Sequence, residues 1–237
     1  MNNELENKFN LLIQKGVSKL SFEKQMEYLQ ENFSSICFST SFSYEDQTIT
    51  HLLKDTQGIE FFTLDTGRLF DQTYDTWNLT LSRYKIKISS YYPDSEALQE
   101  FINLNGPDSF YRSVELRKQC CFIRKVVPLQ KALLNKQVWI TGLRAEHSSN
   151  RQNLSIFEWD QTNQIIKFHP LVFWSSEQVL EFIENNQVPY NPLHKQGYQS
   201  IGCSPCTRAI KPEEDFRAGR WWWEDASKKE CGLHLKQ

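Results

Sequence analysis

Four cysteines that occur as two pairs are the most chemically specific feature of this 237-residue sequence. Cys120 and Cys121 are adjacent, and Cys203 and Cys206 form a C-x-x-C pair. A lone C-x-x-C is compatible with a zinc site, a redox pair or an iron–sulfur site. Two pairs supply the four thiolates that a four-thiolate metal site requires. The sequence therefore predicts that these four thiols act together as metal ligands.

The adjacency of the first pair favours one kind of metal site. Neighbouring residues on a helix point about 100° apart around its axis. Such a pair is awkward around one small tetrahedral zinc ion and easier around a cubane cluster, whose irons are separated from one another. We therefore favour an iron–sulfur cluster. A structural zinc site is the alternative, and metal analysis distinguishes the two.

A fifth thiol, Cys231, is left over from the two pairs. Near it in the sequence are Lys228, Lys229 and His234. Positive neighbours favour the thiolate, which is the nucleophilic form of cysteine. We interpret Cys231 as a catalytic nucleophile rather than an incidental exposed thiol. Cys37 lies inside a predicted strand and is interpreted as a buried core residue.

Composition limits the classes of protein to consider. The formal net charge is −2, so any site for nucleic acid or another anion has to be a local patch. The sequence contains no apolar run of the roughly 18 residues that a membrane helix needs, and its N-terminus lacks a signal-peptide core. We expect a cytoplasmic protein without membrane contact. In a reducing compartment, six cysteines favour metal ligation or thiol chemistry over disulfides.

Candidate strands alternate with helical segments and would position these residues. The strands are SICFSTSF (35–42), IEFFTLD (59–65), KIKISSYYP (85–93) and VWITGL (138–143). This alternation predicts βαβ units and an α/β fold with a mostly parallel sheet. SIFEWDQTNQIIKFHP then predicts a hairpin, and SSEQVLEFIENNQ a helix capped by Ser175 or Ser176.

The chain is expected to have two parts. Residues 1–190 form a nucleotide-binding α/β domain with N-terminal helices, for one of which Ser21 is the predicted N-cap. Residues 191–237 form a C-terminal tail, rich in Gly, Pro and Cys, that lies over the active face.

Three loops after predicted strands carry chemistry that suits an anion. STSFSYED offers hydroxyls and amides at a helix N-terminus, LDTGR offers Gly67 and Arg68, and GLRAEHSSNR offers Gly142, Arg144 and Arg151. Ligands of open α/β sheets bind at the carboxyl ends of the strands, where these loops would meet. Each loop alone has ordinary turn composition, whereas the three together favour a nucleotide site.

These segments resemble the assimilatory adenylyl-sulfate and phosphoadenylyl-sulfate (PAPS) reductases. The resemblance runs from SFSYEDQ at Ser41 through LDTGRLFDQTY, CCFIRKVVPL, WITGLR, VPYNPLH, GYQSIGCSPCTR and RAGRWWWED to KKECGLH, ending at His234. It implies a doubly wound, mostly parallel sheet of the adenine nucleotide alpha hydrolase type with a C-terminal extension over the active site. Both cysteine pairs match the branch that resembles enzymes with one four-iron four-sulfur cluster per subunit. His147 stands where the family usually has Gln, which leaves the role of that side chain open.

The resemblance also implies a reaction and its residues. Cys231 would attack the sulfur of adenosine 5′-phosphosulfate and expel AMP, and thioredoxin or a glutaredoxin-like reductant would then release sulfite from the S-sulfocysteine. The implied phosphosulfate contacts are Lys125, Arg217, Arg220 and His234. The implied adenosine contacts are Ser41, Ser43, Leu64, Gly142 and Arg151. Trp221 to Trp223 are interpreted as a packing wedge for the tail, with stacking on adenine as the alternative.

Other functions fit the sequence less well. A PP-loop enzyme that thiolates RNA is disfavoured because the sequence has no SGGxDS loop and no basic stripe, so no nucleic-acid partner is expected. A metal-dependent interaction module would leave Cys231 and the three loops unexplained. PAPS reduction, or dual specificity, is the nearer alternative. Glu45 and Asp46 would repel an extra phosphate, but Arg68, Arg144 and Arg151 could offset them, so charge leaves the choice open. The resemblance to the cluster-bearing branch, which mostly uses the unphosphorylated nucleotide, implies that substrate. A homo-oligomer is compatible with the sequence.

Overall fold

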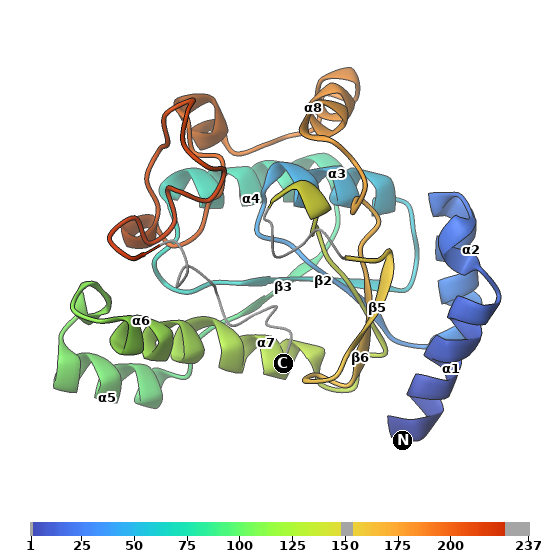
Figure 1. Cartoon of the computed structure of the whole chain (residues 1–237), viewed down its shortest axis with the longest axis horizontal. Helices are drawn as coiled ribbons and strands as arrows, with labels where there is room; N and C mark the ends of the chain where they lie inside the picture. Colours follow the sequence, from blue (N-terminus) through green and yellow to red (C-terminus); the bar gives the residue numbers. More distant parts are fainter. Residues whose placement is uncertain (1, 148–153, 226–237) are drawn as a thin grey trace.

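A six-stranded sheet forms the centre of the protein, seen in a computed structural model that describes residues 2–147 and 154–225 (Figure 1). The strand order is β3-β2-β1-β4-β6-β5, and only the β5–β6 pair is antiparallel. The strands are β1 Ile36–Ser39, β2 Ile59–Leu64, β3 Ile88–Tyr91, β4 Val138–Ile140, β5 Phe157–Asp160 and β6 Ile165–Phe168. The predicted mostly parallel sheet and the hairpin after it are confirmed.

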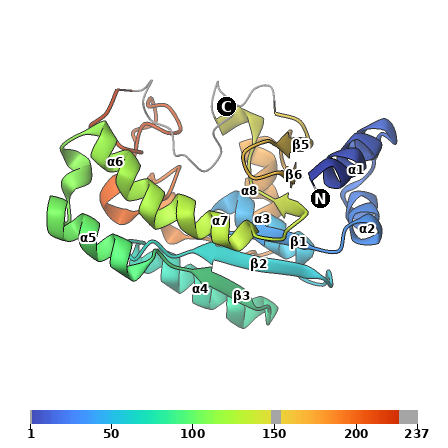
Figure 2. The same cartoon turned by 90° about the horizontal axis from the view of Figure 1, so that it is seen from below.

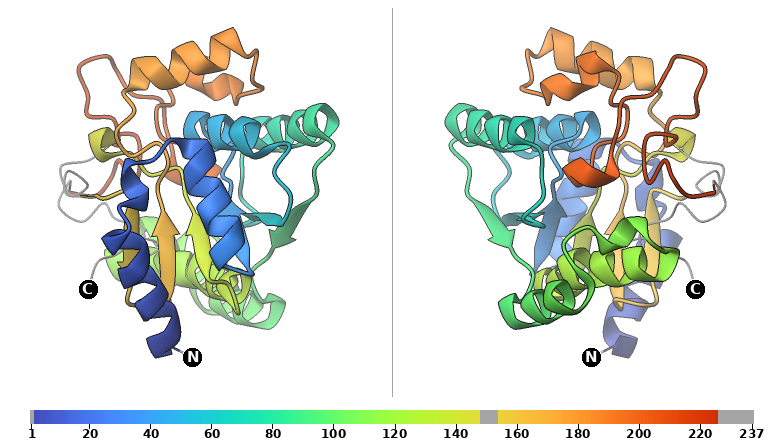
Figure 3. Two further views of the ribbon diagram at one scale, coloured as in Figure 1. Left: turned by 90° about the vertical axis from the view of Figure 1, so that its right-hand side faces the viewer. Right: turned by 90° about the vertical axis from the view of Figure 1, so that its left-hand side faces the viewer.

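Helices cover both faces of this sheet, as a doubly wound fold requires. Their bounds are α1 Asn2–Gln14, α2 Phe22–Asn32, α3 Tyr44–Leu53, α4 Asp71–Tyr84, α5 Ser95–Asn105, α6 Val114–Cys121, α7 Val127–Leu133 and α8 Ser176–Asn185. Helices α3 and α4 lie on one face, and α5, α6 and α7 lie on the other (Figures 1 and 3). In the described ranges, no helix is both long and apolar enough to cross a membrane.

Serine hydroxyls begin several of these helices. The side chains of Ser21, Ser43 and Ser113 accept hydrogen bonds from backbone amides in the first turns of α2, α3 and α6. Ser175 caps α8 in a reciprocal capping box with Gln178. These contacts satisfy amides that have no partner inside the helix. The predicted cap at Ser21 is confirmed, and of the two candidates for α8 the cap is Ser175.

The central strands are buried on both faces, as expected for parallel strands covered by helices. Ile36, Cys37 and Phe38 of β1 are all buried, and so are the three residues of β4. Burial raises the pKa of Cys37 to about 12. The prediction of a core thiol at this position is confirmed.

The helix that carries the adjacent cysteines continues through an irregular segment. A five-residue π-helix, Phe122–Val126, joins α6 to α7, and the two helices lie in one line (Figure 2). A π-helix changes the angular spacing of the side chains and is frequent at functional sites. Lys125 lies on this segment, just after Cys120 and Cys121.

The topology creates a switch point between β1 and β4. From β1 the chain builds β2 and β3 on one side and later returns to add β4 on the other. Ligands of such sheets bind outside the carboxyl ends of the strands at this point. The tail reaches the same region, because the amide of Ser204 donates to the carbonyl of Arg68, which follows β2.

Candidate active site

A pocket of about 240 Å³ lies at the carboxyl ends of β1, β2 and β4, and we call it the nucleotide pocket. The loops after these strands contribute Ser41 and Ser43, Leu64, and Gly142 to its wall. Four of the five residues predicted to contact adenosine therefore lie together. The fifth, Arg151, lies outside the described residues.

Basic side chains from two other parts of the chain line the same pocket. Lys125 comes from the π-helix, and Arg217 and Arg220 come from the tail. Segments more than 170 residues apart, from Ser41 to Arg217, therefore meet at one site. Cys231 and His234, the other two predicted catalytic residues, lie outside the described residues.

The four paired cysteines line a second, smaller cavity, which we call the thiol cavity. Its wall contains Cys120, Cys121, Cys203 and Cys206 together with Arg68, Arg117, Arg124 and Lys125. Within the described residues, no three or more His, Cys, Asp or Glu side chains are arranged to hold a single metal ion. Four thiols around one cavity, beside four basic groups that would compensate thiolate charge, have the donor chemistry of an iron–sulfur cluster.

Lys125 lines both cavities. This side chain therefore lies between the nucleotide pocket, which suits an anionic nucleotide, and the thiol cavity, which suits a metal cluster.

Residues 35–209 match the family model of the phosphoadenosine phosphosulfate reductase domain. The chain belongs to this reductase family. Similar proteins named adenosine 5′-phosphosulfate reductase include that of Allochromatium vinosum, 47% identical over 204 residues, with coverage of 86% of this chain and 80% of that protein. The protein of that name from Burkholderia cepacia is 44% identical over 206 residues, covering 86% and 82% of the two chains.

Solved structures show the same fold. A phosphoadenylyl-sulfate (PAPS) reductase from Candida auris, crystallised as a phosphate complex, superposes with a TM-score of 0.72 at 28% identity, over 85% of this chain and 96% of that chain. An FMN adenylyltransferase from Candida glabrata, at 13% identity and a TM-score of 0.51, over 95% and 78% of the two chains, shares the fold alone. The predicted fold class of the reductase is confirmed.

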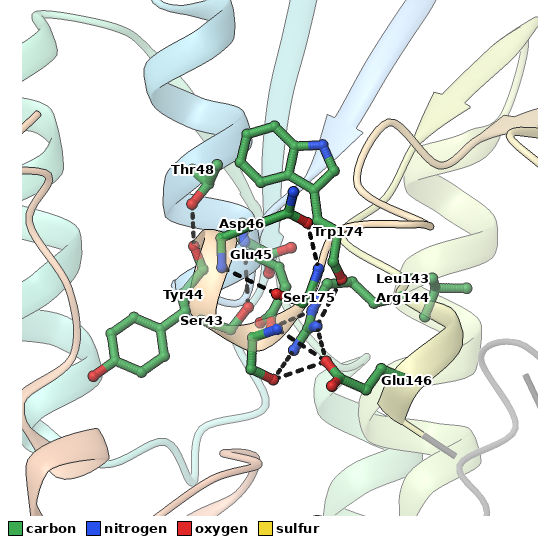
Figure 4. A network of polar contacts seen from close by, with 12 residues as sticks. Ser43, Tyr44, Glu45, Asp46, Thr48, Leu143, Arg144, Glu146, Trp174 and Ser175 are labelled. Atoms are coloured by element: carbon green, nitrogen blue, oxygen red, sulfur yellow. Dashed lines mark hydrogen bonds and ion pairs between the residues drawn. The ribbon is translucent and has the colours of Figure 1, made fainter. Parts of the chain in front are cut away.

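Arg144 of the reductase is not an anion ligand, contrary to the interpretation of its loop. Its guanidinium is buried and donates to Glu45 at 3.0 Å, to the carbonyl of Trp174 and the hydroxyl of Ser176, both at 2.9 Å, and to Glu146 (Figure 4). These bonds fasten the loop after β4 to α3 and α8. Arg144 therefore has a structural role, because its bonds hold this loop in place.

Arg68 is likewise directed away from the nucleotide pocket. It donates to the carbonyl of Pro107 and to Asp108, both at 2.9 Å, and its guanidinium lies over the ring of Phe110. The side chain lines the thiol cavity instead. The expectation that Arg68 and Arg144 offset the acids of the first-strand loop is therefore confirmed only for Arg144, which pairs with Glu45, whereas Arg68 pairs with Asp108.

The tail is anchored to α6 by a buried ion pair. Arg117 donates two hydrogen bonds to Glu224, at 2.9 and 2.6 Å, and both side chains are almost fully buried. The same guanidinium lies 4.6 Å from the ring centre of Trp221, which packs with the cysteines in one buried cluster. Trp221 is therefore a packing residue, as predicted for the Trp triplet. Trp222 is partly exposed and contacts the ring of Tyr111.

A glycine makes room for one of the basic side chains. A Cβ on Gly202 would overlap the guanidinium of Arg220. The backbone of Gly202 is not in the left-handed region, so side-chain space is what this position lacks. Gly202 thus lets Arg220 lie flat against the wall of the nucleotide pocket.

Two residues of the site make contacts that the sequence did not predict. Asp46 is buried and accepts hydrogen bonds from the amide and the hydroxyl of Ser41, both at 2.6 Å. Burial raises the pKa of Asp46 to about 6, against the lowering effect of these bonds. The sequence predicted only that Asp46 and Glu45 would repel an extra phosphate, and nothing local distinguished the two acids.

His194 is the second. Its ring stacks on Tyr44 with 3.9 Å between centroids, and Nδ1 lies 2.8 Å from the carbonyl of Tyr198. Burial lowers the pKa of His194 to about 4, so the ring is neutral near pH 7 and Nδ1–H donates to that carbonyl. His194 thereby fixes the turn before residues 199–202, which line the nucleotide pocket.

Proposed function

We propose that this reductase converts adenosine 5′-phosphosulfate into sulfite and AMP during assimilatory sulfate reduction. Similar proteins of this name match at 44–47% identity over most of the chain. The observation that carries the proposal is the position of Lys125 between the nucleotide pocket and the thiol cavity. A nucleotide site next to four grouped thiols supports this assignment.

The reaction begins with the thiolate of Cys231. It attacks the sulfur of the sulfuryl group, an S–S bond forms, and the bond from that sulfur to the bridging oxygen breaks. The electron pair leaves with the oxygen, which becomes a phosphate oxygen of AMP. The product on the enzyme is an S-sulfocysteine.

A dithiol completes the cycle, and thioredoxin is the proposed donor. One of its thiolates attacks Sγ of Cys231 and sulfite departs with the electron pair of the S–S bond. Its second thiol then displaces Cys231 as the free thiol, so the dithiol is oxidised to a disulfide while the sulfuryl sulfur is reduced by two electrons. A compartment that keeps thiols reduced, such as the cytoplasm, suits this cycle.

The basic residues of the nucleotide pocket stabilise the charge that develops. Arg217, Arg220 and Lys125 present fixed positive charge to the phosphosulfate and to the departing phosphate. His234, in its charged form, is proposed to add to this field and to favour the thiolate of Cys231. Ser41, Ser43, Leu64, Gly142 and Arg151 are the proposed adenosine contacts.

Cys120, Cys121, Cys203 and Cys206 would hold a four-iron four-sulfur cluster. When bound, the cluster would tie α6 to the tail and place concentrated charge beside the basic residues of the thiol cavity. We propose that residues 191–237 act as an extension of the nucleotide-binding domain that this link holds over the pocket.

The first-step product provides the test. The protein, purified without oxygen, is incubated with adenosine 5′-phosphosulfate and no reductant. The intact mass should rise by one sulfonate group, located on Cys231 by peptide mapping, and AMP should be released in equal amount. An adduct on another cysteine, or AMP release without an adduct, would refute the mechanism.

Replacing Gly202 with alanine should weaken nucleotide binding through Arg220. The added methyl group displaces the guanidinium, so we expect a loss of about 1.5–3 kcal/mol, the range for a hydrogen bond to a charged group. Calorimetric titration with AMP measures it. In the double variant with Arg220→Ala, the two losses should not add. Additive losses would mean that Gly202 acts independently of Arg220.

A further inference from the structure

Two neighbouring acids, Glu45 and Asp46, line the nucleotide pocket, and their carboxylates have different partners. Glu45 accepts from the guanidinium of Arg144 at 3.0 Å in a buried pair, so an opposite charge balances it. The carboxylate of Asp46, within the described ranges, is bonded to uncharged groups, the amide and hydroxyl of Ser41. Both of those bonds go to Oδ2. In the part of the chain that the structure describes, Asp46 therefore brings to the pocket wall a carboxylate that is hydrogen-bonded only to uncharged groups.

The other oxygen of Asp46 faces the backbone at the end of β4. A Cβ on Gly142 would overlap Oδ1 of Asp46, so the bare glycine leaves space for this oxygen. Asp46 enters from the first turn of α3, on one face of the sheet. Lys125 enters from the segment between α6 and α7, on the opposite face (Figure 1). The acid and this lysine thus reach the pocket from different sides.

Two arginines of the neighbouring strand-end loops have partners other than Asp46. Arg144 has its donors directed to Glu45, Glu146, Trp174 and Ser176, and Arg68 lies at the thiol cavity with Asp108. Arg151 lies outside the described residues. A ligand group placed against Asp46 would therefore meet a carboxylate, which accepts a hydrogen bond from a hydroxyl and repels a phosphate.

We infer that Asp46 determines which nucleotide this reductase prefers, because it accepts a hydrogen bond from an unmodified sugar hydroxyl and disfavours a 3′-phosphate at that place. The inference rests on the proposed function, since it assumes that the pocket holds the adenosine nucleotide. With its pKa raised to about 6 by burial, the carboxyl group is mostly ionised at pH 7.5, where the discrimination should be measured.

Binding of the product and of its phosphorylated analogue tests the inference without catalysis. AMP and adenosine 3′,5′-bisphosphate are titrated into the full-length protein, purified anaerobically, at pH 7.5. We expect wild type to bind AMP about tenfold more tightly, as a carboxylate near an added dianion at intermediate dielectric would produce. Asp46→Asn keeps an oxygen to accept from Ser41 and removes the charge. It should bind the two nucleotides within about twofold of each other, mainly by gaining affinity for the bisphosphate.

A matched control separates contact from general charge. Glu146→Gln removes one negative charge from the same polar network, but Glu146 does not line the nucleotide pocket. It should leave the discrimination unchanged. Should Asp46→Asn fail to fold, as judged by near-UV circular dichroism, the smaller Asp46→Ser removes the same charge.

The outcomes separate the inference from the proposed function. If wild type binds neither nucleotide, the proposed function fails. If wild type binds both equally, or if Asp46→Asn keeps the tenfold preference, the pocket holds a nucleotide but Asp46 does not select it. If Asp46→Asn weakens the binding of both nucleotides equally, Asp46 only positions its neighbours. If Glu146→Gln also reduces the preference for AMP, the preference comes from the general negative charge of the region and not from Asp46. Each of these four results overturns the inference.

Discussion

Cys231→Ser should lower the rate of sulfite release by at least about a thousandfold, the scale seen when a covalent nucleophile is removed. A serine hydroxyl at neutral pH is almost entirely protonated, so the variant lacks the anionic nucleophile that a cysteine thiolate provides. Turnover is measured with adenosine 5′-phosphosulfate and reduced thioredoxin.

Two properties of the Cys231→Ser variant should be unchanged. Its iron content should equal that of wild type, because the four paired cysteines lining the thiol cavity are the proposed ligands. Its affinity for AMP should also be retained, since AMP binds in the nucleotide pocket without the sulfuryl group. Loss of iron from this variant would show that the division of the thiols into four ligands and one nucleophile is wrong.

Cys206→Ser should lose iron and activity together. Cys206 is buried, lines the thiol cavity and packs with Cys120, Cys203 and Trp221 in one cluster. Serine is a poor ligand for iron, so the site loses one of four thiolates. Iron analysis and the visible absorption of iron–sulfur thiolates measure the first loss, and turnover measures the second.

Cys37→Ser is the matched control for this change. Cys37 is a buried thiol in β1, away from the thiol cavity, and a hydroxyl can take over its hydrogen bond to the carbonyl of Val138. This variant should keep its iron. Full activity of Cys206→Ser without iron would make the cluster dispensable, and one zinc per chain in wild type without iron–sulfur absorption would replace the cluster with a structural zinc site.

Local patterns in the sequence determined the layers of the fold. Runs such as IEFFTLD and VWITGL became β2 and β4 because apolar stretches of this length, between helical segments, are buried only as central parallel strands. Ser21 and Ser175 became caps because a helix start needs an acceptor for its first amides. The grouping of the cysteines followed from their spacing as two pairs.

Only the tertiary structure decided how the charged side chains are used. Arg144 follows a strand in a loop suited to an anion, but Glu45, 99 residues away, captures it in a buried pair. Because Arg144 pairs with Glu45, it does not pair with the neighbouring Asp46. The space that Gly202 leaves for Arg220 likewise depends on how the tail folds back. The physical reason is that a burial pattern is local in sequence, whereas the partner of a charge depends on which loops the folded sheet brings together.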